Sequence, residues 1–127
     1  MKTALLLIAH GSRQEEANAD LFHLADGLRA RDHAIVEASF LELAEPSIED
    51  AGIRCVEQGA QCVILVPYFL SAGVHVRRDL TEARRKLGER FPDVEFRLAE
   101  PLGRHPLLMD VVAERVRESL TNCTKSK

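Results

Sequence analysis

The sequence predicts an α/β protein in which a four-stranded parallel sheet is flanked by helices. Short apolar runs, typical of buried strands, alternate four times along the chain with longer segments whose apolar residues recur at helical spacing. The connections between these segments are short, which favours right-handed crossovers and therefore strands that all run in one direction. At 127 residues the chain has the length of one domain, and no linker separates two cores.

The first half of the chain is expected to form two strands and two helices. Ala4 to Ala9 is a continuous apolar run, the pattern of a strand covered on both faces. The period then changes to that of an amphipathic helix over about residues 13–31. Strand character returns from Ile35 to Leu43. The next helix begins after Ser47, which is placed as its N-cap, and ends at Gly59.

The second half repeats this alternation. Cys62 to Val66 is apolar throughout and predicts a third buried strand. A third amphipathic helix follows and stops near Gly88. Val94 to Leu98 alternates between apolar and charged residues, as an edge strand does. Pro106 then opens the last amphipathic helix, at a position where proline is favoured.

Composition and charge exclude several classes of protein. Hydrophobic residues make up 46% of the chain and charged residues 29%, the balance of a water-soluble globular domain. A net charge of −3 offers no general attraction to nucleic acid, and no stretch approaches the roughly 20 apolar residues that cross a bilayer. Three cysteines without a CxxC pair fit a reducing, cytoplasmic location. We expect one domain over residues 1–120 and a polar, frayed tail over residues 121–127.

Three side chains with metal-ligand chemistry follow the first three predicted strands. His10 comes directly after the first strand, Glu42 stands at the end of the second, and His75 lies in the segment after the third. Ligands of open parallel sheets bind beyond the carboxyl ends of the strands, near the point where strand order reverses. If the first strand lies between the other two, the three side chains converge on one rim. Two imidazoles and a carboxylate suit iron, cobalt, nickel or zinc.

Each of these residues also has a purely structural explanation. His10 could bond to the turn that follows it, Glu42 could pair with an arginine or point into solvent, and His75 could be an ordinary residue at a helix start. The convergence of all three on one rim favours the functional interpretation. His105 lies at the same rim as a loop residue, a helix cap or a secondary candidate.

The segment after the third strand is unusually apolar for a loop. It consists of Tyr68, Phe69, Leu70, Ser71, Ala72, Gly73 and Val74. Such a loop cannot face water freely, so it either fills the core or meets a flat hydrophobic ligand or a partner chain. Arg13, Arg77 and Arg78 border the rim, where guanidinium groups could surround an anionic ligand or simply be solvated.

Several motifs stand in order along the chain: Ala9–Arg13, Phe40–Ser47, Val66–Leu70, Gly73–His75 and Arg78–Asp79. In this order and spacing, over residues 1 to about 120, the sequence resembles the small sirohydrochlorin chelatases, which are class II, ATP-independent metal-inserting enzymes. The resemblance implies a flavodoxin-like fold equivalent to half of the longer two-domain chelatases, and a homodimer. It also implies that Co²⁺ or Fe²⁺ is inserted into sirohydrochlorin for cobalamin or siroheme synthesis. Ni²⁺ is less favoured, because the histidine-rich loop of nickel-using relatives is absent.

The resemblance further implies roles for individual residues. His10 and His75 match metal-binding and catalytic histidines, and Glu42 matches the acidic residue that assists them. Arg13 and the loop from Tyr68 to Val74 are expected to contact the macrocycle and its carboxylates. A non-catalytic carrier of tetrapyrrole or metal that uses the same rim is the alternative. A phosphate-binding domain is disfavoured, because no glycine-rich cradle is present.

Overall fold

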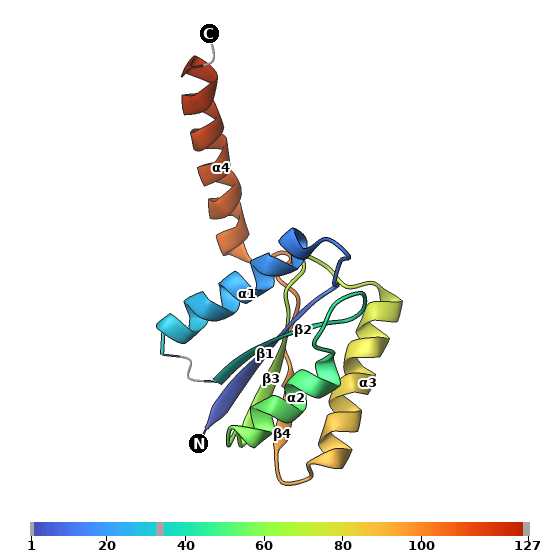
Figure 1. Cartoon of the computed structure of the whole chain (residues 1–127). Helices are drawn as coiled ribbons and strands as arrows, with labels where there is room; N and C mark the ends of the chain where they lie inside the picture. Colours follow the sequence, from blue (N-terminus) through green and yellow to red (C-terminus); the bar gives the residue numbers. More distant parts are fainter. Residues whose placement is uncertain (1, 33–34, 126–127) are drawn as a thin grey trace.

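The computed structural model describes residues 2–32 and 35–125. Within these residues four parallel strands form one sheet in the order β2-β1-β3-β4 (Figure 1). The strands are β1 (Thr3–Ala9), β2 (Ile35–Phe40), β3 (Cys62–Pro67) and β4 (Glu95–Leu98). The helices that follow them in turn are α1 (Glu15–Ala30), α2 (Ile48–Glu57), α3 (Val74–Arg90) and α4 (Pro106–Lys125). The predicted fold class and the alternation of strands and helices are confirmed.

The two faces of the sheet are covered unequally. Figure 1 shows α1 on one side of the sheet and α2 and α3 on the other. The core under α2 and α3 includes Leu6, Ile8, Val63, Leu65, Leu80 and Leu87, and the core under α1 includes Leu7, Leu21, Ala25, Val36 and Phe40. Alternate residues of each strand supply the two cores, as the period of a strand requires.

The second strand is shorter than the sequence predicts. It ends at Phe40, whereas strand character was expected to continue to Leu43. The expectation is wrong because Leu43 has a φ of 64°, a left-handed conformation that a strand does not contain. The chain instead loops back, so that the carbonyl of Pro46 accepts a hydrogen bond from the Phe40 N–H (2.9 Å). The Glu45–Pro46 peptide bond in this loop is cis.

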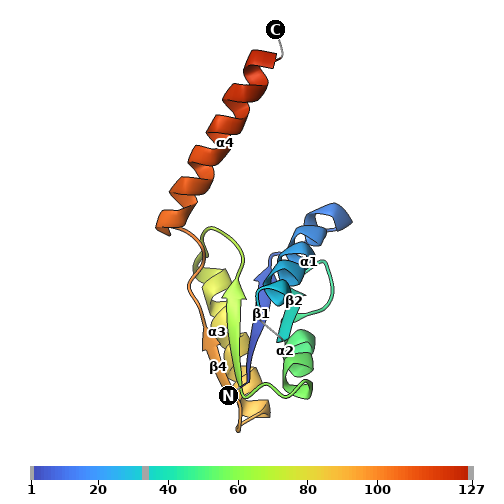
Figure 2. The ribbon, with the colours of Figure 1, turned by 90° about the vertical axis from the view of Figure 1, so that its left-hand side faces the viewer.

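The last helix departs from the expected pattern in length and direction. α4 continues to Lys125, so the chain is still helical over residues 121–125 of the expected tail, and residues 126–127 lie outside the described residues. Figures 1 and 2 show α4 leaving the end of the sheet at which β3 points and running away from it. Among residues 106–121, whose side chains the structure describes, only Leu108 is half-buried and the others are exposed.

The direction of α4 leaves part of one sheet face without a helix. α1 packs over β1 and β2. Since α4 points away, the described chain provides no helix to cover the same face over β3 and β4. None of the helices in the described residues combines the length and the hydropathy that a membrane-spanning segment needs.

Candidate functional site at the carboxyl rim of the sheet

The carboxyl ends of β1, β2 and β3 meet at one rim, because the strands are parallel and β1 lies between the other two. This strand order is the one under which the sequence predicts that the segments carrying His10, Glu42 and His75 come to the same end of the sheet. That condition is confirmed. The strand order reverses at β1, which is where open α/β sheets bind their ligands.

Gly11 allows the turn after β1 to touch the loop after β2. The N–H of Glu42 donates to the carbonyl oxygen of His10 at 3.1 Å. Gly11 has a φ of 95°, and a Cβ atom there would lie 1.8 Å from the carbonyl oxygen of Glu42. Only glycine accommodates both the conformation and the approach. Gly11 therefore holds the backbone of His10 against that of Glu42.

The imidazole of His10 packs against the ring of Phe69. The two ring centroids are 4.5 Å apart and the planes are inclined by 30°. Phe69 is half-buried and packs against the core under α2 and α3, whereas the His10 side chain is exposed. The core thus supports one side of an imidazole that a ligand can still reach.

Asn18 stabilises the turn that begins after His10. Its Oδ1 accepts from the Ser12 N–H (3.0 Å), and its Nδ2 donates to the Ser12 carbonyl (2.8 Å). The Ser12 hydroxyl in turn accepts from the Gln14 N–H (3.0 Å). Sequence reasoning did not single out Asn18, although an asparagine in the first turn of a helix often bonds to nearby backbone. Arg13 lies within this turn with an exposed side chain.

The candidate ligands do not form a three-ligand set within one copy of the chain. Glu42 lies in a loop with an exposed side chain, and His75 is an exposed residue of the first turn of α3, two positions after its N-cap Gly73. Within the part of the chain that the structure describes, no three His, Cys, Asp or Glu residues are grouped closely enough to hold a metal ion. Because β2 ends at Phe40, the backbone of the sheet does not fix the direction of the Glu42 side chain. The ligand roles of His10, Glu42 and His75 stay predictions.

The loop after β3 presents large apolar side chains to solvent at this rim. Tyr68 is 38% exposed, Leu70 63% and Val74 72%, and Leu43 from the loop after β2 is 55% exposed. The core-filling alternative therefore holds for Phe69 and not for these neighbours. An apolar patch of this kind favours contact with a hydrophobic ligand or a partner chain.

The side chains of Arg77 and His105 bond to backbone atoms of the segments near the rim. The Nε of Arg77 donates to the carbonyl of Ala72 (3.1 Å), and its guanidinium lies 3.8 Å from the carboxylate of Glu100. The Nδ1 of His105 accepts from the Leu107 N–H (3.2 Å) at the start of α4, so the helix-cap interpretation of His105 is confirmed. Arg78, like Arg13, is exposed.

The two cysteines whose side chains the structure describes are not available as thiolates. Burial, assisted by Glu37, raises the pKa of Cys55 to about 12. Burial and the nearby Glu95 carboxylate raise the pKa of Cys62. Both are unpaired. Since the thiolate is the form that binds metals, the candidate metal ligands at neutral pH are imidazoles and carboxylates.

The chain is similar to known proteins over a range that includes residues of all four strands of the described sheet. The model of the CbiX family matches residues 4–119. The chain is 36% identical to the chloroplastic sirohydrochlorin ferrochelatase of Arabidopsis thaliana, over 93% of this chain and 53% of the relative. It is 32% identical to a sirohydrochlorin cobaltochelatase of Sulfolobus acidocaldarius, over 92% of each chain.

Solved structures give the same result. A putative cobalamin biosynthesis CbiX protein from Marinobacter aquaeolei superimposes with a TM-score of 0.81 at 32% identity, over 94% of this chain and 98% of that one. The sirohydrochlorin chelatase SirB from Bacillus subtilis subspecies spizizenii, in complex with cobalt, gives 0.84 at 32% identity, over 93% and 51%. The chain thus spans about half the length of the plant and Bacillus proteins and nearly all of the shorter relatives.

Proposed function

The chain belongs to the CbiX family, and from this membership and the rim geometry we propose that it inserts a divalent metal ion into sirohydrochlorin. Co²⁺ is the favoured ion and Fe²⁺ the second, which corresponds to a step of cobalamin or siroheme synthesis. The observation that carries the proposal is the rim itself. There the accessible imidazole of His10 is supported by Phe69 and lies next to a loop with exposed apolar side chains.

Metal insertion demands three things of this rim. The macrocycle must lose two pyrrole protons, the metal ion must shed part of its water shell, and the ion must pass to the ring nitrogens. In our proposal His10 and His75 bind the ion and accept the protons, since a neutral imidazole serves as ligand and as base near pH 7. Glu42 orients or ligates the ion. Incomplete coordination by the protein suits a metal that is a substrate, because a closed set of four ligands would retain it.

The remaining features of the rim suit the macrocycle. Tyr68, Leu70 and Val74 offer apolar surface to the flat ring. The exposed guanidinium groups of Arg13 and Arg78 can pair with the carboxylates of the macrocycle. Arg77 stabilises the loop after β3, because its Nε donates a hydrogen bond to the carbonyl of Ala72. The proposed reaction uses no ATP, and the sequence carries no glycine-rich phosphate cradle of the kind that nucleotide-binding loops use.

We also propose that the protein acts as a homodimer in a reducing compartment such as the cytoplasm. The exposed apolar rim and the exposed apolar face of α4 support a dimer, and the unpaired Cys55 and Cys62 support the compartment.

The test is a metal-insertion assay that follows the absorbance of sirohydrochlorin with Co²⁺, Fe²⁺ and Ni²⁺ in parallel. The wild type should convert sirohydrochlorin in excess over enzyme. His10→Ala should lower the rate by at least about 100-fold, the scale of general base catalysis. His23→Ala is the matched control, since His23 is an exposed histidine of α1 away from the strand ends, and it should leave the rate unchanged. A wild-type rate for His10→Ala would refute the assignment, and conversion of only one equivalent would indicate a carrier.

A further inference from the structure

A groove opens between the loop after β3 and the linker that joins β4 to α4. Its volume is about 540 Å³, and it is lined by Leu70, Ser71, Arg77, Glu100, Pro101, Gly103 and Arg104. Two guanidinium groups and a single carboxylate leave this groove with a net positive charge. Leu70, which is 63% exposed, adds an apolar wall. The lining therefore suits an anionic group carried on a hydrocarbon stem.

Arg104 has a backbone conformation that its side chain disfavours. The N–H of His105 donates to the carbonyl of Leu102 (3.3 Å), which closes a turn whose third residue is Arg104. Arg104 has a φ of 66°, where glycine or asparagine is the usual residue, because an L side chain crowds the backbone there. Residues held in such a conformation cluster at binding and active sites. The strain at Arg104 thus points to a use for its side chain.

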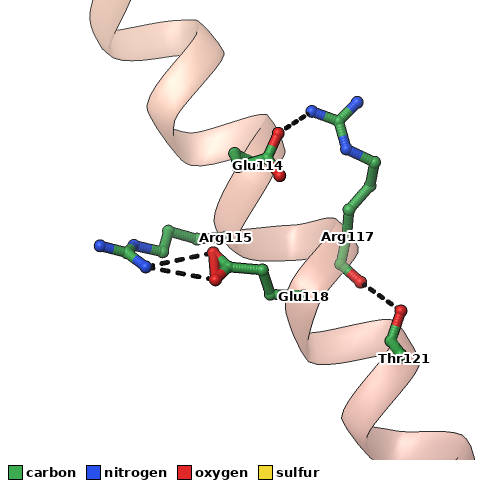
Figure 3. A network of polar contacts seen from close by, with 5 residues as sticks. All are labelled: Glu114, Arg115, Arg117, Glu118 and Thr121. Atoms are coloured by element: carbon green, nitrogen blue, oxygen red, sulfur yellow. Dashed lines mark hydrogen bonds and ion pairs between the residues drawn. The ribbon is translucent and has the colours of Figure 1, made fainter.

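The guanidinium of Arg104 has no partner, unlike those of the next arginines along the chain. Figure 3 shows Arg117 of α4 paired with Glu114. It also shows Arg115 paired with Glu118 at 3.1 Å. Within the part of the chain that the structure describes, no carboxylate lies within ion-pair distance of Arg104, and its side chain makes no hydrogen bond. Its charge is therefore available to a ligand.

Arg77 lines the same groove and is only weakly neutralised. Its Nε donates to the carbonyl of Ala72 (3.1 Å), which holds the side chain against the loop after β3. Its terminal nitrogen lies 3.8 Å from the carboxylate of Glu100, and the two side chains are 57% and 86% exposed. Water screens an ion pair this open and this long, so it contributes little. A carboxylate that enters the groove can replace Glu100 beside Arg77.

The linker wall of the groove is held in place by backbone contacts. The N–H of Ala99 donates to the carbonyl of Leu65 (2.9 Å). A Cβ atom at Gly103 would lie 2.1 Å from the carbonyl oxygen of Leu70, so only glycine lets the linker approach the loop this closely. The backbone thus forms the groove in advance, which reduces the entropy lost when a ligand binds.

Phe69 joins this groove to the imidazole of His10. The ring of Phe69 packs on His10 with the centroids 4.5 Å apart, and its carbonyl accepts from the Leu102 N–H (3.0 Å). Arg104 comes two residues after Leu102, so its backbone lies within about 12 Å of the Phe69 carbonyl. A macrocycle whose centre lies at His10 can span such a distance with its ring and one side chain.

We propose that the groove is a subsite for one carboxylate side chain of the macrocycle, with Arg104 as its main anion-binding residue and Arg77 as the second. This inference rests on the proposed function and deepens it, because it names a part of the substrate that the chain selects. A guanidinium pairs with a carboxylate through two parallel hydrogen bonds, and Leu70 contacts the stem of the side chain. Glu100 opposes binding, since it competes for Arg77.

The first experiment measures the KM for sirohydrochlorin in variants that each remove one charge. Arg104→Gln should raise KM about 10-fold and leave kcat unchanged, the result of losing a charged hydrogen bond that holds substrate and transition state alike. Glu100→Gln should lower KM about three-fold. The matched control is Arg84→Gln, because Arg84 is exposed and unpaired and lies about 15 Å along α3 from its first residue. Equal KM values for Arg104→Gln and Arg84→Gln overturn the subsite.

The second experiment separates a role in binding from a role in folding. Arg104→Gly relieves the left-handed strain, so it should raise the urea midpoint of unfolding while it raises KM as Arg104→Gln does. A lower urea midpoint for Arg104→Gly would mean that the arginine serves the fold, and it overturns the assignment.

The third experiment measures binding of metal-free porphyrins by their fluorescence and requires no metal insertion. Arg104→Gln should weaken the binding of uroporphyrin, a polycarboxylate, about 10-fold relative to wild type and to Arg84→Gln. A cationic porphyrin with N-methylpyridinium groups in place of the carboxylates should lose no affinity. Equal losses for both porphyrins, or none for uroporphyrin, refute the subsite alone where the wild type inserts metal. A wild type that inserts no metal but shows the selective loss refutes the function alone.

Discussion

Replacing Gly11 with alanine tests the contact that joins the first two strand ends. The new Cβ would lie 1.8 Å from the carbonyl oxygen of Glu42 and 3.0 Å from its carbonyl carbon, and these backbone atoms cannot swing aside. A non-glycine residue held at positive φ costs about 1–3 kcal/mol. Relief of the overlap also requires the Glu42 N–H to leave the His10 carbonyl, a loss of about 1 kcal/mol. We expect Gly11→Ala to lower the free energy of unfolding by the sum of these two costs, roughly 2–4 kcal/mol.

Substitutions at two other glycines separate the cost of a positive φ from the cost of steric overlap with the backbone. Gly59 has a φ of 97°, but its Cβ would meet only the flexible side chain of Lys2 at 3.2 Å, so Gly59→Ala should cost about 1–2 kcal/mol. Gly88 lies within α3 with open space around it, and Gly88→Ala should stabilise by about 0.5–1 kcal/mol. Urea unfolding followed by circular dichroism measures all three. If Gly11→Ala lowers the free energy of unfolding no more than Gly59→Ala does, the close approach of Gly11 to Glu42 does not restrain the rim.

Two further predictions concern the helix start after Pro46 and a buried thiol. Ser47→Ala should lower the free energy of unfolding by about 1 kcal/mol, because the Ser47 hydroxyl accepts from the Asp50 N–H (3.1 Å), whereas Ser47→Asp should keep stability within a few tenths. Cys55 has a pKa of about 12 in the folded protein against 9.0 for the free thiol. Between these values only the unfolded Cys55 thiol ionises, so this residue should lower stability by about 1.4 kcal/mol per pH unit as pH rises, and the pH slope of Cys55→Ala should be shallower by that amount. Equal pH slopes for the two proteins would contradict the second prediction.

The sheet could be predicted because its signals are local. The apolar run at Ala4–Ala9 lies within the observed β1, and Cys62–Val66 lies within β3. The start of α2 was predicted from one side chain, Ser47, whose hydroxyl does cap the helix. The end of β2 could not be predicted, since the left-handed conformation of Leu43 belongs to a loop that returns to bond Phe40.

The candidate site was predictable only to the level of the rim. Strand order follows from the alternation of strands and helices, and it brings the segments carrying His10, Glu42 and His75 to one end of the sheet. The positions of the side chains depend on contacts between segments that are distant in sequence, such as the ring of Phe69 against His10. No pattern in the sequence marks those contacts, and the same is true of the direction in which α4 leaves the linker.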